Sequence, residues 1–117
     1  DVILATGYGV ISIQEGDSPA HQRLLSIRAS KLDAYRALTE QVYGQYLDTK
    51  TTVAEMVVQS DSFRSRVQGI IYGARLVSIT TVGEDTYETT LSLDNKIVSD
   101  LRKLYLASTS SPKMARS

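Results

Sequence analysis

A long uninterrupted helix is the strongest constraint that this sequence places on its fold. After Pro19 the chain runs to Tyr43 without a further glycine or proline, and Gly44 follows as a helix stop. Asp17 or Ser18 is suited to cap the start, and Pro19 fits the first turn. The segment has an apolar stripe of Ala20, Leu24, Leu25, Ile27, Ala29, Leu32, Ala34, Leu38 and Val42, and an opposite side that includes Arg23, Ser30, Asp33 and Gln41. At about 1.5 Å per residue, the helix is about 36 Å long and can cover an entire small sheet.

Four segments have the composition of β-strands. In the first, residues 2–13, one face holds only apolar residues and glycine. Gly7 and Gly9 on that face either allow a helix to approach closely or mark a bulge. Residues 45–59 are rich in threonine and valine and indicate a long second strand. Residues 74–82 and 86–93 read as a hairpin joined by a turn at Gly83-Glu84-Asp85.

Two further helices complete the predicted fold. Ser60 or Asp61 is placed to cap a short helix that runs through Val67, and Asp94 to cap a closing helix to about Leu106. The closing helix has an inward face of Ile97, Val98, Leu101, Leu104 and Tyr105. We therefore expect an α+β two-layer sandwich with a sheet of about four strands, on which one long helix and a C-terminal helix pack. Residues 1–106 form a single domain in this prediction, and residues 107–117 form a flexible tail.

The charge balance excludes some classes of partner. The 117 residues contain 13 basic and 13 acidic side chains. A nucleic-acid binder or a polybasic membrane-surface module needs an excess of basic side chains, so neither is expected. The longest uncharged stretch runs from Val2 to Gln14 and is too short for a membrane-spanning helix. The chain has no cysteine, which rules out disulfides, thiolate nucleophiles and cysteine-based zinc sites within it.

A search for catalytic chemistry finds no convincing constellation. His21, the single histidine, falls in the first turn of the long helix and is expected to be solvated. Ser12 has no base near it in the sequence, and Asp33 and Glu40 are expected to be ordinary solvated carboxylates on that helix. Gly7-Tyr8-Gly9 lacks the third glycine of a phosphate-binding loop. The sequence thus predicts no enzyme and no catalytic, cofactor or metal site.

Tyrosines and arginines are the residue types that point to a function. Both are enriched at the centres of protein–protein interfaces. The candidate interface residues are Tyr35, Arg36, Tyr46, Arg64, Arg66, Tyr72 and Arg75. An alternative is that the tyrosines complete the core and the arginines keep the surface soluble. The threonine-rich strands offer a second route to association through edge-to-edge pairing, against which Lys50 and Glu55 are the visible guards.

An ordered set of short motifs resembles a known family. The motifs are Ala5-Thr6-Gly7-Tyr8-Gly9, Asp33-Ala34-Tyr35-Arg36-Ala37-Leu38, Glu40-Gln41-Val42-Tyr43-Gly44, and Asp61 with Arg64, Val67, Gly69 and Gly73-Ala74-Arg75. Over about residues 2–94 the chain resembles the flagellar assembly protein P (FlgP) family of small outer-membrane lipoproteins, and also domains at the start of flagellar assembly protein T. The resemblance implies a structural subunit of a large homo-oligomeric ring, the flagellar H-ring or basal disk, on the periplasmic side of the outer membrane.

The same resemblance implies partners. These are other copies of the chain, protein T and associated H-ring components, and the outer membrane through a lipidated cysteine that must lie upstream of residue 1. A ring requires a heterologous interface, in which one patch meets a different patch on the next copy. The alternative function is a periplasmic module that binds a small ligand or peptidoglycan on the sheet face around Tyr8 and Tyr46.

Overall fold

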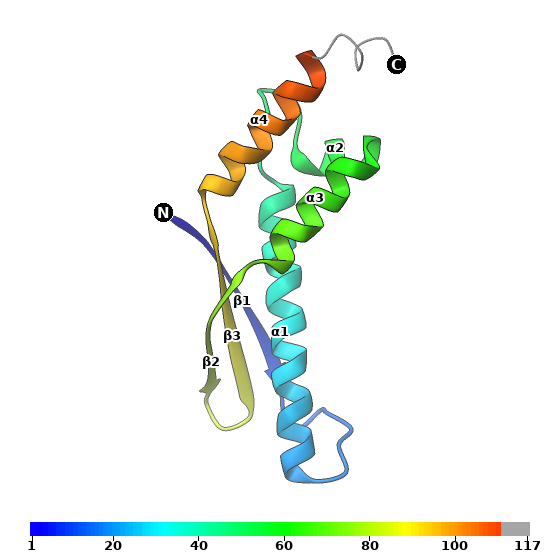
Figure 1. The fold of residues 1–117 in the computed structure, drawn as a ribbon. Helices are drawn as coiled ribbons and strands as arrows, with labels where there is room; N and C mark the ends of the chain where they lie inside the picture. The colour runs from blue at the N-terminus through cyan, green and yellow to red at the C-terminus, as the bar shows by residue number, and fades with distance from the viewer. Residues whose placement is uncertain (111–117) are drawn as a thin grey trace.

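The structure is a computed structural model and describes residues 1–110, the side chains of residues 109 and 110 excepted (Figure 1). Its elements in chain order are β1 (Val2–Val10), α1 (Pro19–Tyr43), α2 (Val53–Gln59), α3 (Asp61–Tyr72), β2 (Arg75–Val82), β3 (Thr86–Asp94) and α4 (Lys96–Ser110). The three strands form an antiparallel sheet in the order β1-β3-β2. The α+β class, the long helix on the sheet and the C-terminal helix are all confirmed.

Helix α1 runs along one face of the sheet, where it packs mainly on β1 and β3 (Figure 1). Helices α2 and α3 lie beside its C-terminal half, and α4 continues beyond the end of the sheet. The molecule is elongated, with extents of 60 × 28 × 21 Å. Its radius of gyration of 17.8 Å exceeds the roughly 13 Å of a compact chain of this length. A large share of its residues therefore lies near the surface.

The contact between β1 and α1 is closer than ordinary side chains permit. A Cβ atom added to Gly7 would lie 2.0 Å from the backbone nitrogen of Ala34, and one added to Gly9 would lie 2.0 Å from the carbonyl oxygen of Ser26. The two glycines thus let the helix backbone rest directly on the strand, which is one of the two alternatives that the sequence left open. On the helix side, the residues that meet the strand are also small.

This close approach changes which side of α1 is buried. The buried residues are Ser26, Ser30, Ala34, Leu38 and Val42. The prediction that Ser30 lies on the polar side was wrong, and so was the placing of Leu24 and Leu32 in the buried stripe, because they are 46% and 65% exposed. Only small side chains fit where the helix backbone touches the glycines, so serine occupies the inner face and leucine is displaced outward.

A buried hydroxyl pair joins the helix to the central strand. The Ser30 hydroxyl donates to the carbonyl oxygen of Ile27 at 2.7 Å and lies 2.6 Å from the Thr89 hydroxyl. Because the single Ser30 proton is directed to Ile27, the Thr89 hydroxyl is the donor between the two side chains. Both groups are satisfied, so neither incurs the cost of an unpaired buried hydroxyl. Thr89 lies opposite Gly7 in the register, which puts this pair beside the closest backbone approach.

Residues 45–59 do not form the predicted strand, and the sheet therefore has three strands rather than about four. Asp48 closes a turn by accepting the backbone N–H groups of Lys50 and Thr51, and Thr52 then caps α2 in a reciprocal capping box with Glu55. Both are local side chain–backbone bonds that compete with a strand. All that remains of strand pairing is one bridge between Tyr46 and Thr52. The Thr-x-x-Glu pattern at residues 52–55 is the sequence signal that indicates the start of this helix.

The other boundaries differ by small amounts. Strand β1 ends at Val10 rather than at residue 13, since Ser12 bonds to Asp85 at the hairpin turn through its N–H and its hydroxyl. Helix α3 starts after the Ser60 cap and runs on to Tyr72, five residues beyond the predicted end. Helix α4 extends through Ser110, so residues 107–110 of the predicted tail are helical, and residues 111–117 lie outside the described part of the chain.

The glycine contact is testable with a matched pair of variants. Gly7→Ala should destabilise the protein by about 3 kcal/mol, the upper end of the usual cost of overpacking, because the new methyl group meets rigid helix backbone. Gly69→Ala is the control, since an added Cβ meets nothing within 4 Å in α3. Gly69→Ala should stabilise the protein by about 0.5–1 kcal/mol, because alanine has a higher helix propensity than glycine. Urea unfolding measures both, and equal effects of the two substitutions would contradict the proposed packing.

Candidate interaction surfaces

The outer edge of β1 is closed by side chains. The Asp33 carboxylate of α1 accepts the N–H of Tyr8 at 2.8 Å, and the Gln41 amide donates to the carbonyl oxygen of Leu4 at 2.7 Å. The Gln14 amide donates to the carbonyl oxygen of Val10 at 2.9 Å. Three of the backbone groups that would otherwise pair with another strand are thereby occupied. The prediction that Asp33 is simply a solvated carboxylate missed this contact, because nothing in sequence distance relates residues 8 and 33.

The other edge of the sheet is open. Strand β2 has β3 on one side, and within residues 1–110 no strand lies on its other side. Helix α1 packs mainly on β1 and β3, so Leu76, Val77 and Val82 each stay about half exposed. The chain has no charged residue between Arg75 and Glu84 that would discourage pairing. We call this outer side of β2 the free edge, and it is the part of the sheet best suited to β-sheet extension.

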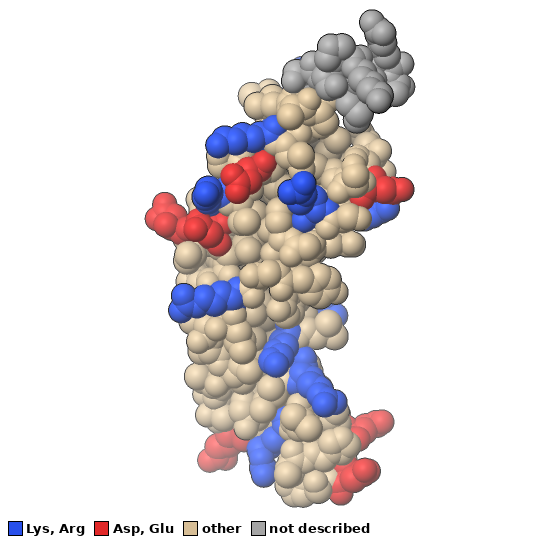
Figure 2. All heavy atoms as spheres, in the orientation of Figure 1, with Lys and Arg blue, Asp and Glu red and all other residues tan. Residues whose placement is uncertain are grey.

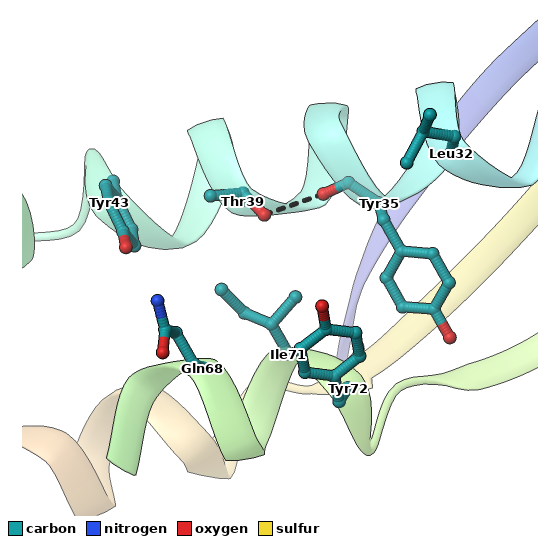
Figure 3. Close-up of a pocket in the computed structure, with 7 residues that line it drawn as sticks. All are labelled: Leu32, Tyr35, Thr39, Tyr43, Gln68, Ile71 and Tyr72. Carbon is teal, nitrogen blue, oxygen red and sulfur yellow. Dashed lines mark hydrogen bonds between the residues drawn. The ribbon is translucent and has the colours of Figure 1, made fainter. Parts of the chain in front are cut away.

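A second surface is an aromatic groove between α1 and α3, with a volume of about 310 Å³. Figure 3 shows four side chains of α1 facing three of α3: Leu32, Tyr35, Thr39 and Tyr43 opposite Gln68, Ile71 and Tyr72. The rings of Tyr35 and Tyr72 are tilted by 44° with centroids 6.0 Å apart, which is a favourable aromatic geometry. Tyr72 is 78% exposed, so the groove is open to solvent at this end.

The seven candidate interface residues do not form one patch. The structure brings together only Tyr35 and Tyr72, which line the aromatic groove. Two of the arginines are held by carboxylates three residues earlier, Arg36 by Asp33 at 3.8 Å and Arg64 by Asp61. The remaining three are dispersed: Arg66 on the exposed side of α3, Arg75 at the start of β2, and Tyr46 in the loop before α2. Tyr43, Gln68 and Ile71 were missed because only the crossing of α1 and α3 brings them together.

The loop before α2 is hydrogen-bonded to α4. The Arg102 guanidinium donates to the carbonyl oxygen of Tyr46 at 2.9 Å, and the Tyr105 hydroxyl donates to Asp48 at 3.0 Å. Hydrogen bonds from the backbone N–H groups of Lys50 and Thr51 hold the pKa of Asp48 below its ordinary value of 3.8, and the Tyr105 hydroxyl acts in the same direction. The ionised Asp48 therefore joins the turn to the C-terminal helix.

This anchor should make stability sensitive to acid. The pKa of Asp48 is lower in the folded than in the unfolded chain, so its contribution is complete above pH 3.8 and is lost as the pH falls below that value. Asp48→Asn should lower the free energy of unfolding at pH 7 and reduce its further decline below pH 3.8. Urea unfolding at both pH values tests this, with Asp100→Asn at an exposed position of α4 as the control. The same pH dependence in both variants would contradict the role of Asp48.

Charges of both signs lie on the visible surface. Figure 2 shows lysine and arginine interspersed with aspartate and glutamate at both ends of the molecule, whereas the charged side chains in the middle of this face are basic. His21 lies at the start of α1, where its Nδ1 accepts the N–H of Asp17 at 3.0 Å. Among residues 1–110 no helix has the length and apolar character needed to cross a bilayer.

These features define an α+β domain whose distinctive surfaces are a strand edge and an aromatic groove. The model of the LPP20 lipoprotein family matches residues 3–94, which contain α1 to α3 and all of the sheet except Val2. The chain therefore belongs to the LPP20 lipoprotein family, which includes FlgP-like proteins. Membership of a lipoprotein family that includes FlgP-like proteins is thus confirmed, and the finer resemblance to FlgP stays a prediction. A search of curated proteins finds no match.

Proposed function

We propose that this chain is a structural subunit that self-assembles into a large ring around the flagellar basal body, beneath the outer membrane. The observation that carries the proposal is the free edge of β2, on a domain whose other sheet edge is closed. Membership of a lipoprotein family that includes FlgP-like proteins supports the flagellar setting. The proposed role is mechanical and involves no catalysis.

Closing a ring requires two different patches on each copy. The free edge on β2 and the aromatic groove between α1 and α3 are two separate surfaces, each available for a contact with another copy. The zero net charge of the chain favours close association, because many copies of a strongly charged subunit repel one another. Protein T and related ring components are the proposed neighbours.

The proposed anchor is a lipid on a cysteine that precedes residue 1 in the whole protein. The family is one of lipoproteins, and residues 1–117 contain no cysteine. Residue 1 begins next to β1, at the end of the sheet where α4 also starts (Figure 1).

Assembly should depend on the aromatic groove more than folding does. Tyr72→Ala should raise the concentration needed for large assemblies at least tenfold, because it removes an exposed ring from the groove rather than a core residue. Val58→Ala on α2 is the control, since Val58 is 83% exposed and lies outside the groove. Sedimentation velocity and negative-stain imaging measure assembly, and urea unfolding checks folding. Rings of unchanged size and stability with Tyr72→Ala would contradict this use of the groove.

The aromatic groove also favours a second candidate, a module that binds a small ligand or a peptidoglycan fragment. The sheet face expected around Tyr8 and Tyr46 does not form one site. Tyr8 lies beside Asp33, whereas Tyr46 follows the end of α1, about 15 Å further along the helix axis. The groove combines tyrosine rings with the amide of Gln68, a combination suited to sugar rings.

A melting experiment separates the two candidates. If the groove binds a peptidoglycan fragment, a saturating muropeptide should raise the melting temperature of the wild type, and Tyr43→Ala should abolish the shift. If the groove serves assembly alone, the muropeptide leaves the melting temperature unchanged while the protein still forms large particles. A strictly monomeric protein with a ligand-dependent shift would overturn the ring proposal in favour of the binding module.

A further inference from the structure

We infer that two copies of this chain associate two-fold through β2, pairing antiparallel across the free edge with Ile79 of each copy at the axis. This deepens the proposed self-assembly, on which it rests, by naming the occupant of the free edge. Three features of the molecule support this pairing: the backbone groups of β2 that point outward, the occupied edge of β1, and the charges at the two ends of β2.

The hydrogen bonds of β1 show which way its backbone groups point. The carbonyl oxygen of Leu4 and the N–H of Tyr8 are turned toward α1, so the backbone N–H and C=O groups of even-numbered residues of β1 point away from β3. The N–H of Ile11 donates to the carbonyl oxygen of Asp85 at 2.7 Å, which places odd-numbered residues in the ladder between these two segments. In an antiparallel pair the bonded residues alternate, so the even-numbered residues of β3 turn their backbone groups toward β2.

The register of β2 then identifies the groups on the free edge. Ser78 and Thr80 lie opposite even-numbered residues of β3, so their N–H and C=O groups bond within the sheet. Ile79 and Thr81 alternate with them and direct their N–H and C=O groups outward. Within residues 1–110 no strand covers these groups. They form the template that another strand would use.

The occupant best matched to this template is β2 of a second copy. Strand β1 of a second copy is a poorer match, because Asp33 and Gln41 already bond to two backbone groups of its outer edge. Strand β3 is central and has no edge. Pairing of the same strand from two copies is isologous, and an antiparallel arrangement satisfies the two-fold symmetry.

Charge complementarity favours the antiparallel arrangement. An axis at Ile79 places Ser78 opposite Thr80 of the second copy. The strand is irregular between Leu76 and Ser78, and beyond this point Arg75 lies toward the end of β2 that carries Glu84 in the second copy. Symmetry produces this contact twice. Neither Arg75 nor Glu84 has an ion pair within the described residues. They lie at opposite ends of β2, roughly 25–30 Å apart, so they cannot pair within one copy.

The resulting pair has a continuous sheet of six strands, three from each copy. The half-exposed side chains of Leu76, Val77 and Val82 lie at the junction, where pairing removes part of their surface from water. An isologous contact forms a closed pair and does not propagate, so a ring built from such pairs needs another contact elsewhere. The two-fold pair is thus the unit from which larger assemblies would grow.

Single cysteines test the geometry, because the chain has no other cysteine. Opposed residues in a bonded antiparallel pair have Cα atoms about 5.5 Å apart, within disulfide range. Ile79→Cys should therefore form a disulfide-linked dimer under mild oxidation with copper phenanthroline. Thr81→Cys is the matched control on the same edge, since its symmetry mate is offset by four residues or about 13 Å. Non-reducing electrophoresis measures both.

Charge reversal tests the antiparallel arrangement independently. Arg75→Glu and Glu84→Arg should each weaken dimerisation at least tenfold by sedimentation, because each places like charges together twice. An equimolar mixture of the two variants should recover a dimer, since both contacts then join opposite charges. Failure of the mixture to recover the dimer would overturn the assigned antiparallel arrangement.

The outcomes separate this inference from the ring proposal. Cross-linking of Ile79→Cys but not of Thr81→Cys supports the β2 pair. If the wild type associates but the two cysteines cross-link equally or not at all, the β2 pair is wrong and self-assembly stands. If the wild type stays monomeric at every concentration, both the pair and the self-assembly proposal fail.

Discussion

The direct contact between the backbone of α1 and the glycines of β1 is the constraint on which the rest of the structure depends. Gly7 and Gly9 leave no room for any side chain larger than hydrogen, and the helix meets them with Ser26, Ser30 and Ala34. Close packing of this kind fixes both the rotation of the helix and its height above the sheet. The buried Ser30–Thr89 hydroxyl pair then locks the helix to the central strand.

The same placement makes the two sheet edges unequal. With α1 drawn over β1, Asp33 and Gln41 reach the outer edge of that strand and occupy its backbone groups. The helix is consequently displaced from β2, whose apolar side chains and outer backbone groups remain available. The packing of α1 over β1 therefore protects one edge of the sheet and exposes the other, which directs any sheet extension to β2.

The parts of the fold that could be predicted are those with local signals. The helix of α1 followed from Ser18, Pro19 and Gly44, and the β2–β3 hairpin from its Gly83 turn, where φ is +68°. Residues 45–59 were misjudged because β-propensity was weighed above the capping box at Thr52.

The interaction surfaces were harder to predict, because they depend on tertiary placement. Tyr35 and Tyr72 were correctly selected as candidates by residue type, but their contact arises only from the crossing of α1 and α3. The hydrogen bonds from Asp33 and Gln41 to β1 depend on the contact between α1 and the glycines of β1, and no local pattern in the sequence predicts them. Periodicity also favoured leucine over serine for the inner face of α1, since it contains no information on how close a sheet will come.

Amide hydrogen exchange as a function of protein concentration tests the central claim most directly. The account predicts that the Tyr8 N–H is protected at every concentration, because Asp33 accepts it within one copy. The N–H groups of Ile79 and Thr81 should exchange rapidly in dilute protein and become protected as copies associate. Rapid exchange of the Tyr8 N–H would contradict an assembly built on one closed and one free edge. The same conclusion would follow if the protein associates but the N–H groups of Ile79 and Thr81 keep the same protection at every concentration.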